Sequence, residues 1–459
     1  MLAAWCVLAP AAALVGSWTE RPAITFLPEC ERPLGTLVIG IGTEGSRYFM
    51  LPEARPCEEP RAGEEIAAEL YALDVELSHG ALLRRLPERT HLYVAAPATA
   101  GVAGREKEFF RRYLGSRCGW TPQDLERRLH FFEVSAPIVF AQDPGKVLGY
   151  DGAGRRVIAT SSADDPAYRA FVQALVSSYP DTFTRYDLGA GLSAEGGDQE
   201  IVRLPGGGLG VLLGHRRVQR YYGIVGPKEV REARLDPAQI QKAVAAYSRA
   251  LADLPLQVLP RGALLNPSLA NPDLYHLDMS VCVLSTPGMV DAFVPTFRDA
   301  PVDRMTGQAL APDYVGQVQT LFDLAAGELG ARGYAVTRLP FWDHPARTPV
   351  NVCKFRDPTT GRTVVMLPKY PDHDPAGARA QQQVNALLQR TRDEFAAVSG
   401  CAAQRALVRG LWEQILAIEA LPNPLFETRK RLIESRGYDV VEVPMFAWGG
   451  GSLHCLTMH

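Results

Sequence analysis

The sequence has no closely spaced cysteine pairs, no basic tract and no long apolar run in its interior. Its eight cysteines are scattered over 459 residues without a CxxC pair, so a structural zinc site is not predicted. The net charge is −3 and charges of both signs are interspersed, which argues against nucleic acid as a partner. No interior stretch reaches the roughly 18 apolar residues of a membrane-spanning helix, so a membrane partner is not predicted either.

Residues 1–22 form a segment of their own. The run from Leu2 to Gly16 is apolar and similar to the hydrophobic region of a secretory signal. No Lys or Arg precedes Arg21, so the positively charged start of such a signal is missing. One expectation is a signal-like or poorly ordered N-terminus. The other is that the segment is an apolar first part of the fold or follows a misassigned start. Localisation therefore stays open between the cytoplasm and export.

The rest of the chain alternates short apolar runs with longer amphipathic patterns, which predicts an α/β protein. With 47% hydrophobic residues it can bury one very large core or two to three ordinary ones. Strands are predicted at 36–41, 92–95, 131–134, 147–150, 157–159, 350–355, 363–367 and 439–443. Helices are predicted at 64–85, 237–254, 314–332 and 426–435, with a helical insertion near 378–421. No linker and no repeat of 20 to 50 residues is legible, so residues 23–459 are expected to form one domain.

A glycine-rich segment near the C-terminus is the first candidate for chemistry. Gly449, Gly450 and Gly451 precede His454 and Cys455. Three glycines let the backbone approach another group closely, and a cysteine after such a turn can lie at a cleft. A free cysteine is more often a packed core residue, which is the alternative for Cys455.

A His-x-Asp segment is the second candidate. His276 and Asp278 are followed by the apolar run 279–284, which predicts a strand. Residues two apart in a strand point to the same face, so both side chains would lie together with Leu277 opposite. This arrangement suits a general acid or base beside a carboxylate. The alternative is a solvated pair at the start of a strand.

Two turn-like segments complete the set. Glu195 begins a Glu-Gly-Gly-Asp segment ahead of a predicted strand, where it could orient a histidine. Phe140 and Asp143 belong to Phe-Ala-Gln-Asp before Pro144, where they could supply an apolar wall and a carboxylate for a cation. Each segment alone is equally consistent with an ordinary turn.

The order of these four segments resembles the pentein superfamily of guanidino-group-modifying proteins. The branch it resembles most contains the agmatine deiminases and the bacterial protein-arginine deiminases, whose terminal motif is Gly-Gly-Gly-x-His-Cys-x-Thr. Residues 449–457 are similar to that motif with one extra residue. Residues 28–33 are similar to the Glu-(Trp/Phe)-Glu-Pro entry of this branch, and residues 348–352 to its Ser/Thr-Tyr-Val-Asn-Phe strand. The resemblance covers nearly the whole chain, from residue 28 to 457.

The resemblance implies a single-domain α/β propeller with five ββαβ units around a central polar site. The chain departs from the branch in two places. Phe140 to Asp143 stand where agmatine deiminases usually carry Trp-x-Arg-Asp, and Gln142 is similar to the residue of animal protein-arginine deiminases. Pro349 replaces an aromatic residue. These departures concern the substrate more than the chemistry.

The resemblance also implies a reaction, the hydrolysis of a guanidinium to a ureido group with release of ammonia. Cys455 would be the nucleophile and His276 the acid and base, oriented by Glu195. Asp143 and Asp278 would hold the guanidinium, because carboxylates match its fork of N–H groups. No metal and no organic cofactor is expected.

The expected substrate is agmatine or the arginine side chain of a peptide. Arg185, preceded by Thr184, is similar to the arginine with which animal protein-arginine deiminases contact the substrate backbone, although a solvated loop residue is the ordinary alternative. No arginine stands in the five residues before Cys455, where free-arginine deiminases hold the substrate carboxylate. An amidinotransferase and a non-enzymatic pentein module are the rival classes. The oligomeric state is not predicted.

Overall fold

The computed structural model describes residues 23–41, 60–97, 102–135, 138, 140–266, 276–286, 288–298, 301–303, 308–370, 400–445 and 453–459, with a few separate positions between 382 and 398. The N-terminal segment 1–22 and the glycines 449–451 lie outside these residues, so the predictions made for them stay predictions.

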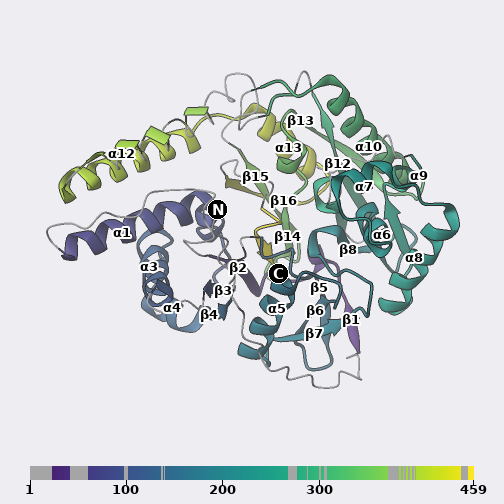
Figure 1. The fold of residues 1–459 in the computed structure, drawn as a ribbon, viewed down its shortest axis with the longest axis horizontal. Helices are drawn as coiled ribbons and strands as arrows, with labels where there is room; N and C mark the ends of the chain where they lie inside the picture. The colour runs from purple at the N-terminus through teal and green to yellow at the C-terminus, as the bar shows by residue number, and fades with distance from the viewer. Residues whose placement is uncertain are drawn as a thin grey trace, which may run out of the picture.

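The described strands form five small sheets of three or four strands (Figure 1). The two four-stranded sheets have the orders β17 (Thr457–Met458), β2 (Thr36–Gly40), β3 (His91–Pro97), β4 (Leu129–Val134), and β1 (Ile24–Phe26), β5 (Val147–Asp151), β6 (Arg156–Thr160), β7 (Phe183–Asp187). The three-stranded sheets have the orders β10 (Leu256–Leu259), β9 (Leu209–Gly214), β8 (Gln199–Arg203); β11 (Cys282–Thr286), β12 (Met289–Phe297), β13 (Ala335–Phe341); and β14 (Cys353–Arg356), β15 (Thr363–Lys369), β16 (Asp439–Pro444).

One pairing pattern recurs in these sheets. A central strand pairs antiparallel on one side and parallel on the other, as β9 does with β8 and β10, and β12 with β11 and β13. The same holds for β6, β15 and β2. A parallel neighbour needs a crossover connection, and a helix lies in each of these crossovers. The fold is therefore mixed α/β, as predicted.

The helices that make these crossovers and connect the sheets vary widely in length. They are α1 (Pro60–Val75), α2 (Ala81–Leu83), α3 (Val102–Arg117), α4 (Pro122–Arg128), α5 (Pro166–Ser178), α6 (His215–Tyr221), α7 (Pro227–Glu232), α8 (Pro237–Ala250), α9 (Gly262–Leu265), α10 (Pro312–Gly330), α12 (Cys401–Glu419) and α13 (Pro424–Glu434). One π-helical turn, η2 (Glu76–Gly80), joins α1 to α2, and 3-10 turns occur at η1 (Glu29–Glu31), η3 (Gly196–Asp198), η5 (Leu277–Met279) and η6 (Pro345–Arg347).

Helix α8 illustrates how local sequence sets these elements. Asp236 accepts a hydrogen bond from the backbone N–H of Gln239 at the N-terminus, and Pro237 occupies the first turn, where its missing N–H costs nothing. Ile240 and Tyr247 then repeat at helical spacing and are buried in the core between α8 and β9. The predicted helix therefore has the predicted buried face.

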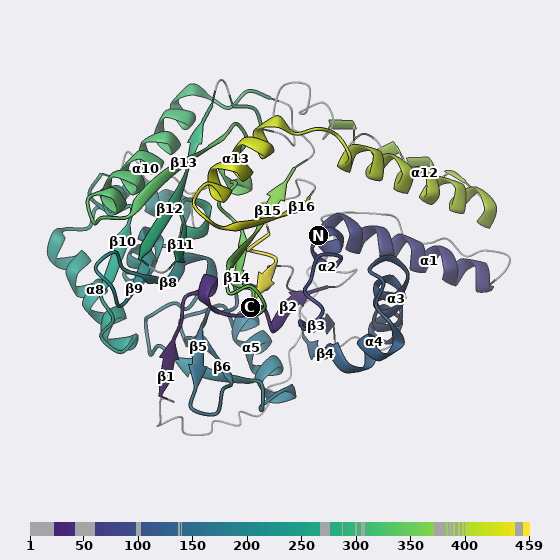
Figure 2. The ribbon, with the colours of Figure 1, turned by 180° about the vertical axis from the view of Figure 1, so that it is seen from behind.

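The C-terminal segment lies among the sheets, near β2, β5 and β14, in both Figure 1 and Figure 2. In both views α3, α4, α8 and α10 lie toward the outside. Helices α1 and α12 pack against each other and extend together beyond the sheets. Helix α12 falls within the predicted insertion near 378–421, and Cys401 at its start is disulfide-bonded.

The predicted strands and helices agree with those observed, apart from shifts at their ends and the first part of the strand predicted at 276–284. The hairpins 147–159 and 350–367 appear as the antiparallel pairs β5–β6 and β14–β15. Among the described residues no helix combines the length and apolar character needed to cross a bilayer.

Candidate active site

The candidate residues lie in five segments, each just ahead of a strand. Asp143 precedes β5, Glu195 precedes β8, and His276 precedes β11, while Asn351 and Cys455 precede β14 and β17. Each of these five strands is the antiparallel partner in one of the five sheets. The segments are therefore equivalent positions of one recurring pattern, and the structure brings their side chains together.

His276 is the centre of the cluster. Its Nε2 lies 2.8 Å from Glu195 Oε1, and its Nδ1 lies 3.9 Å from Asp143 Oδ1. The side-chain ligand atoms of His276, Asp278 and Cys455 all lie within 4.8 Å of one another. The five predicted residues of this cluster, Asp143, Glu195, His276, Asp278 and Cys455, are all buried.

Cys455 is held from several sides. The side-chain amide of Asn351 donates to Cys455 Sγ at 3.2 Å, and Sγ lies 3.9 Å from Asp278 Oδ2. The Cys455 carbonyl accepts a hydrogen bond of 3.2 Å from the backbone N–H of Gln142, which links the terminal segment to the turn that carries Asp143. The sulfur is therefore fixed among polar groups and is not a cysteine packed in an apolar core.

The two glycines of the Glu-Gly-Gly-Asp segment allow this close assembly. A Cβ on Gly196 would lie 2.1 Å from the Gln142 carbonyl oxygen, and one on Gly197 would lie 2.6 Å from His276 Nδ1. Both separations are far shorter than real carbon contacts. Glycine is thus required here because neighbouring backbone and the histidine ring occupy the space of a side chain.

The charges around His276 favour its protonated form. Burial alone would lower its pKa, but the carboxylates of Asp143 and Asp278 and the Cys455 sulfur raise the pKa of His276 to about 10. Burial raises the pKa of Asp143 to about 6, an effect that His276 opposes and Asp278 reinforces. At neutral pH the ring is an imidazolium facing acidic side chains.

Burial also raises the pKa of the Cys455 thiol, to about 11. The negative charge of Asp278 adds to this rise, and a hydrogen bond with His276 opposes it. A cation placed beside Asp143 and Asp278 would offset their charge and so favour the thiolate.

The predicted strand at 276–284 is wrong in its first part. His276 lies directly before the 3-10 turn η5, which contains Asp278, and β11 begins only at Cys282. The turn is closed by a 2.9 Å hydrogen bond from the backbone N–H of Ser280 to the Leu277 carbonyl. His276 and Asp278 reach the same cysteine through this turn and not through the two-residue period of a strand.

A second layer behind Asp278 was not predicted. His454 Nδ1 lies 2.7 Å from Asp278 Oδ2, and its Nε2 lies 3.1 Å from Glu29 Oε2. Glu29 also forms a buried ion pair with Lys146. Burial alone would lower the pKa of His454, but the charge of Glu29 raises it, so the ring can donate to both carboxylates. This layer fixes Asp278 beside the sulfur.

Asn351, His454 and Glu29 all lie inside segments quoted for the resemblance, and that position is the signal that could have identified them. Asn351 Oδ1 also accepts hydrogen bonds from the backbone N–H groups of His454 and Cys455, at 2.9 and 3.3 Å. One amide thus positions both the sulfur and its backbone.

Two arginines of α6 bind Glu195, and no pattern in the sequence indicated this contact. Arg220 forms an ion pair with the Glu195 carboxylate, and Arg217 donates to the Glu195 carbonyl oxygen. Tyr168 of α5 donates to Asp143 Oδ2 at 3.4 Å. These side chains orient the two acidic groups nearest to His276.

The two remaining predicted residues are Phe140 and Arg185. Phe140 is half-buried against the core formed by β2, β3 and α1, and its carbonyl accepts from the backbone N–H of Asp143. Arg185 lies half-buried on β7. Burial lowers the pKa of Arg185, and the negative charge of Asp187 opposes this effect. The contacts described above do not include the Arg185 side chain, so its predicted role stays a prediction.

The cluster also contains two sets of side chains spaced as ligands of a single metal ion would be. They are His276, Asp278, Cys455 and Asp143, Glu195, His276, each with its ligand atoms within 4.8 Å. Thiolate, imidazole and carboxylate together would suit zinc. A metal-binding imidazole must be neutral, however, and the raised pKa of His276 opposes that state.

No protein-family model and no curated protein matches the sequence. Among solved structures, the chain is similar to a crystal structure of a Porphyromonas gingivalis protein that carries the provisional name arginine deiminase. The sequence identity is 15%, the TM-score is 0.45, and the match covers 94% of this chain and 97% of the other. A likeness of this degree assigns neither the fold nor the reaction.

Proposed function

We propose that the chain is a cysteine-dependent hydrolase that converts a guanidinium group to a ureido group and releases ammonia. The observation that carries this proposal is a single buried cluster of one thiol, one imidazole and three carboxylates. Hydrolysis of a resonance-stabilised cation needs a nucleophile, a proton donor and fixed negative charge, and these groups supply all three.

Substrate binding and activation are coupled in this proposal. The Oδ1 atoms of Asp143 and Asp278 are buried and accept no hydrogen bond from the described residues. A guanidinium offers five N–H donors and a positive charge, which would satisfy both oxygens. The bound cation also lowers the pKa of the Cys455 thiol, so the nucleophile forms when the substrate is present.

The proposed reaction has two stages. The Cys455 thiolate adds to the guanidinium carbon, and the His276 imidazolium gives its proton to the departing nitrogen, which leaves as ammonia. The neutral ring then takes a proton from water, and the resulting hydroxide attacks the S-alkylthiouronium carbon. The C–S bond breaks as the added hydroxyl group loses its proton to solvent, a neutral ureido product leaves, and the thiolate is restored. Glu195 holds the ring in position through both stages.

The five recurring sheets support a more specific proposal than a mixed α/β fold, namely a propeller of five ββαβ units. Each unit would contribute the loop ahead of its antiparallel strand to a common centre. The contacts among Asp143, Glu195, His276, Asn351 and Cys455 agree with that arrangement. The single domain over residues 23–459 belongs to the same proposal.

Assays on agmatine, free arginine, methylarginines and a blocked arginine peptide test the reaction. Free ammonia together with a ureido product is expected, and retention of activity after chelator treatment is expected from a thiol mechanism. Transfer of the amidino group to an amine without ammonia would indicate an amidinotransferase. Loss of activity on chelation, restored by zinc, would favour the metal alternative.

The same assays decide between the two proposed substrates. We expect the blocked peptide to be preferred, and Arg185→Ala to lower kcat/KM for the peptide but not for agmatine. Arg155→Ala, a partly exposed arginine of the β5–β6 hairpin, is the matched control. If agmatine is favoured by about a hundredfold, nearly 3 kcal/mol, the peptide proposal is wrong.

Asp143→Asn should lower kcat/KM by about a hundredfold, because a buried carboxylate that pairs with a cation loses its charge with little change of shape. Steady-state kinetics on the preferred substrate measure this effect. Asp151→Asn is the matched control, since Asp151 is a buried turn aspartate of the β5–β6 hairpin outside the cluster. Equal kinetics in both variants would return Asp143 to the role of a turn residue.

A further inference from the structure

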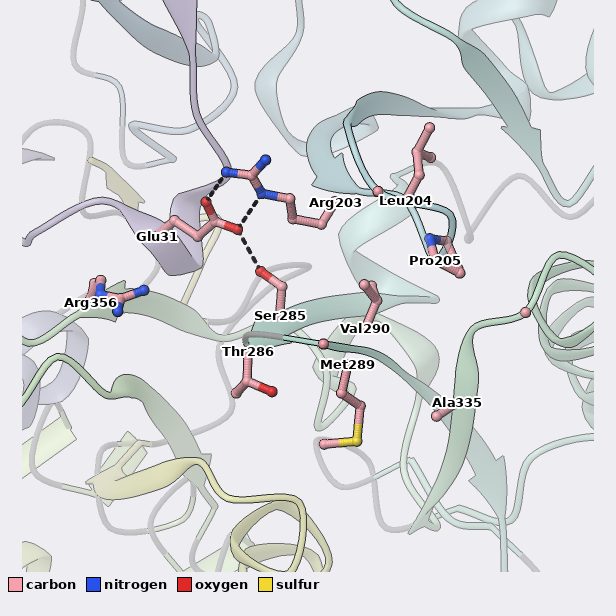
Figure 3. A pocket seen from close by; sticks show the side chains of 13 residues that line it. Glu31, Arg203, Leu204, Pro205, Ser285, Thr286, Met289, Val290, Ala335 and Arg356 are labelled. Carbon is pink, nitrogen blue, oxygen red and sulfur yellow. Dashed lines mark hydrogen bonds and ion pairs between the residues drawn. The ribbon is translucent and has the colours of Figure 1, made fainter.

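A cavity of about 500 Å³ lies apart from the cysteine cluster. Figure 3 shows the polar residues Glu31, Arg203, Ser285 and Arg356 and the apolar residues Met289 and Val290 in its lining. Its volume is within the range of sites that bind small molecules.

The cavity and the cluster lie at opposite ends of the same strands. Glu195 and His276 precede β8 and β11, whereas Arg203 ends β8, and Ser285 lies at the end of β11. Asn351 likewise precedes β14, and Arg356 ends it. Five residues of strand span roughly 13 Å, so the cavity is a separate site and not an extension of the cluster.

The negative charge in the cavity is already satisfied. Arg203 donates to both oxygens of Glu31, at 2.8 and 2.7 Å, and the Ser285 hydroxyl donates to Oε1 at 2.8 Å (Figure 3). Burial alone would raise the pKa of Glu31, but these hydrogen bonds lower it, so the carboxylate stays ionised. A cationic ligand would have to displace a bidentate arginine.

Arg356 contributes a positive charge to the cavity lining that is not paired with Glu31 as Arg203 is. The cavity lining contains two arginines and one acidic residue, and the acidic residue is paired with Arg203. In the described part of the chain, no hydrogen bond or ion pair satisfies the guanidinium of Arg356, and its positive charge is one of the influences that lower the pKa of Glu31. A carboxylate or phosphate matches such a fork with two parallel hydrogen bonds.

Part of the cavity lining is apolar. Leu204 and Pro205 follow β8, and Met289 and Val290 begin β12, where they pair with Thr286 and Ser285, so aliphatic side chains line the cavity beside its polar groups (Figure 3). We propose that this cavity binds a small organic anion, a carboxylate or a phosphate monoester on a short apolar chain. Arg356 would bind the anionic group, while the apolar part of the lining would cover the chain.

Titration calorimetry on the full chain with hexanoate, hexyl phosphate, hexanol and hexylamine tests this site without any assay of turnover. At least one of the two anions should bind about tenfold or more tightly than the alcohol and the amine, and the better anion identifies the head group. Similar affinities for all four compounds, or no binding by either anion, would overturn the proposal.

Two variants locate the binding. Arg356→Gln should weaken the anion by about tenfold or more, whereas Arg362→Gln, an exposed arginine of the same hairpin outside the cavity, should leave it within about twofold. Met289→Trp keeps every charge and fills part of the cavity, so it should also weaken the anion by about tenfold or more. Unchanged affinity in a folded Arg356→Gln or Met289→Trp protein would show that the anion binds elsewhere.

Discussion

Replacing Cys455 with Ala should abolish turnover of the guanidino substrate, with a loss of at least about a thousandfold in kcat. The thiolate forms the covalent intermediate in the proposed reaction, and Asn351, Asp278 and His276 are arranged around its sulfur. The variant should still fold, because a methyl group fits where the thiol was. Release of ammonia by a purified and folded variant is the measurement.

A second cysteine provides the control for this variant. Cys118 is a free, partly exposed cysteine directly after α3, and Cys118→Ala should keep turnover close to that of the unaltered chain. Trapping adds a positive readout, because rapid quenching should recover a substrate adduct on the unaltered chain and none on Cys455→Ala. An active Cys455→Ala protein would remove the proposed mechanism altogether.

The fold elements that the sequence predicted depend on local patterns. Helix α10, for example, buries Val318, Phe322 and Leu329, which recur at helical spacing. The recurrence of the sheets was not predictable, since the five units share a strand order and not a sequence. Their crossovers range from a single helix, α5, to a connection of several helices between β9 and β10. No fixed period in the sequence can therefore result.

The nearest contacts of the reactive groups were predictable only in part. Cys455, His276 and Glu195 occupy motif positions, and the structure brings them together. The two-residue period of a strand predicted that His276 and Asp278 lie together, but a 3-10 turn and not a strand sets their orientation. The layer behind Asp278 joins His454 to Glu29, which are 425 positions apart, and such contacts follow from the tertiary fold alone.

Replacing His276 with Gln should lower kcat by about a hundredfold to ten-thousandfold, because the amide cannot give a proton to the leaving nitrogen. Glutamine can still donate a hydrogen bond to Glu195, which lies 2.8 Å from the ring, so the local structure should persist. The thiolate should also become harder to form, since the imidazolium that favours it is gone. Ultraviolet titration of the Cys455 thiolate should therefore give a higher apparent pKa in the variant.

The pH dependence of stability separates this chemical role from a structural one. The pKa of His276 is raised to about 10, so the charged ring stabilises the fold fully below the ordinary histidine pKa, and this stabilisation is lost as the pH rises through about 10. The difference in unfolding free energy between the unaltered chain and His276→Gln should then be largest near pH 6 and shrink toward pH 10. His130→Gln, whose ring is partly buried beside His91, is the matched control and should leave turnover unchanged. If His276→Gln kept its full kcat while showing the expected change in stability, the ring would be a structural cation and not the acid of the reaction.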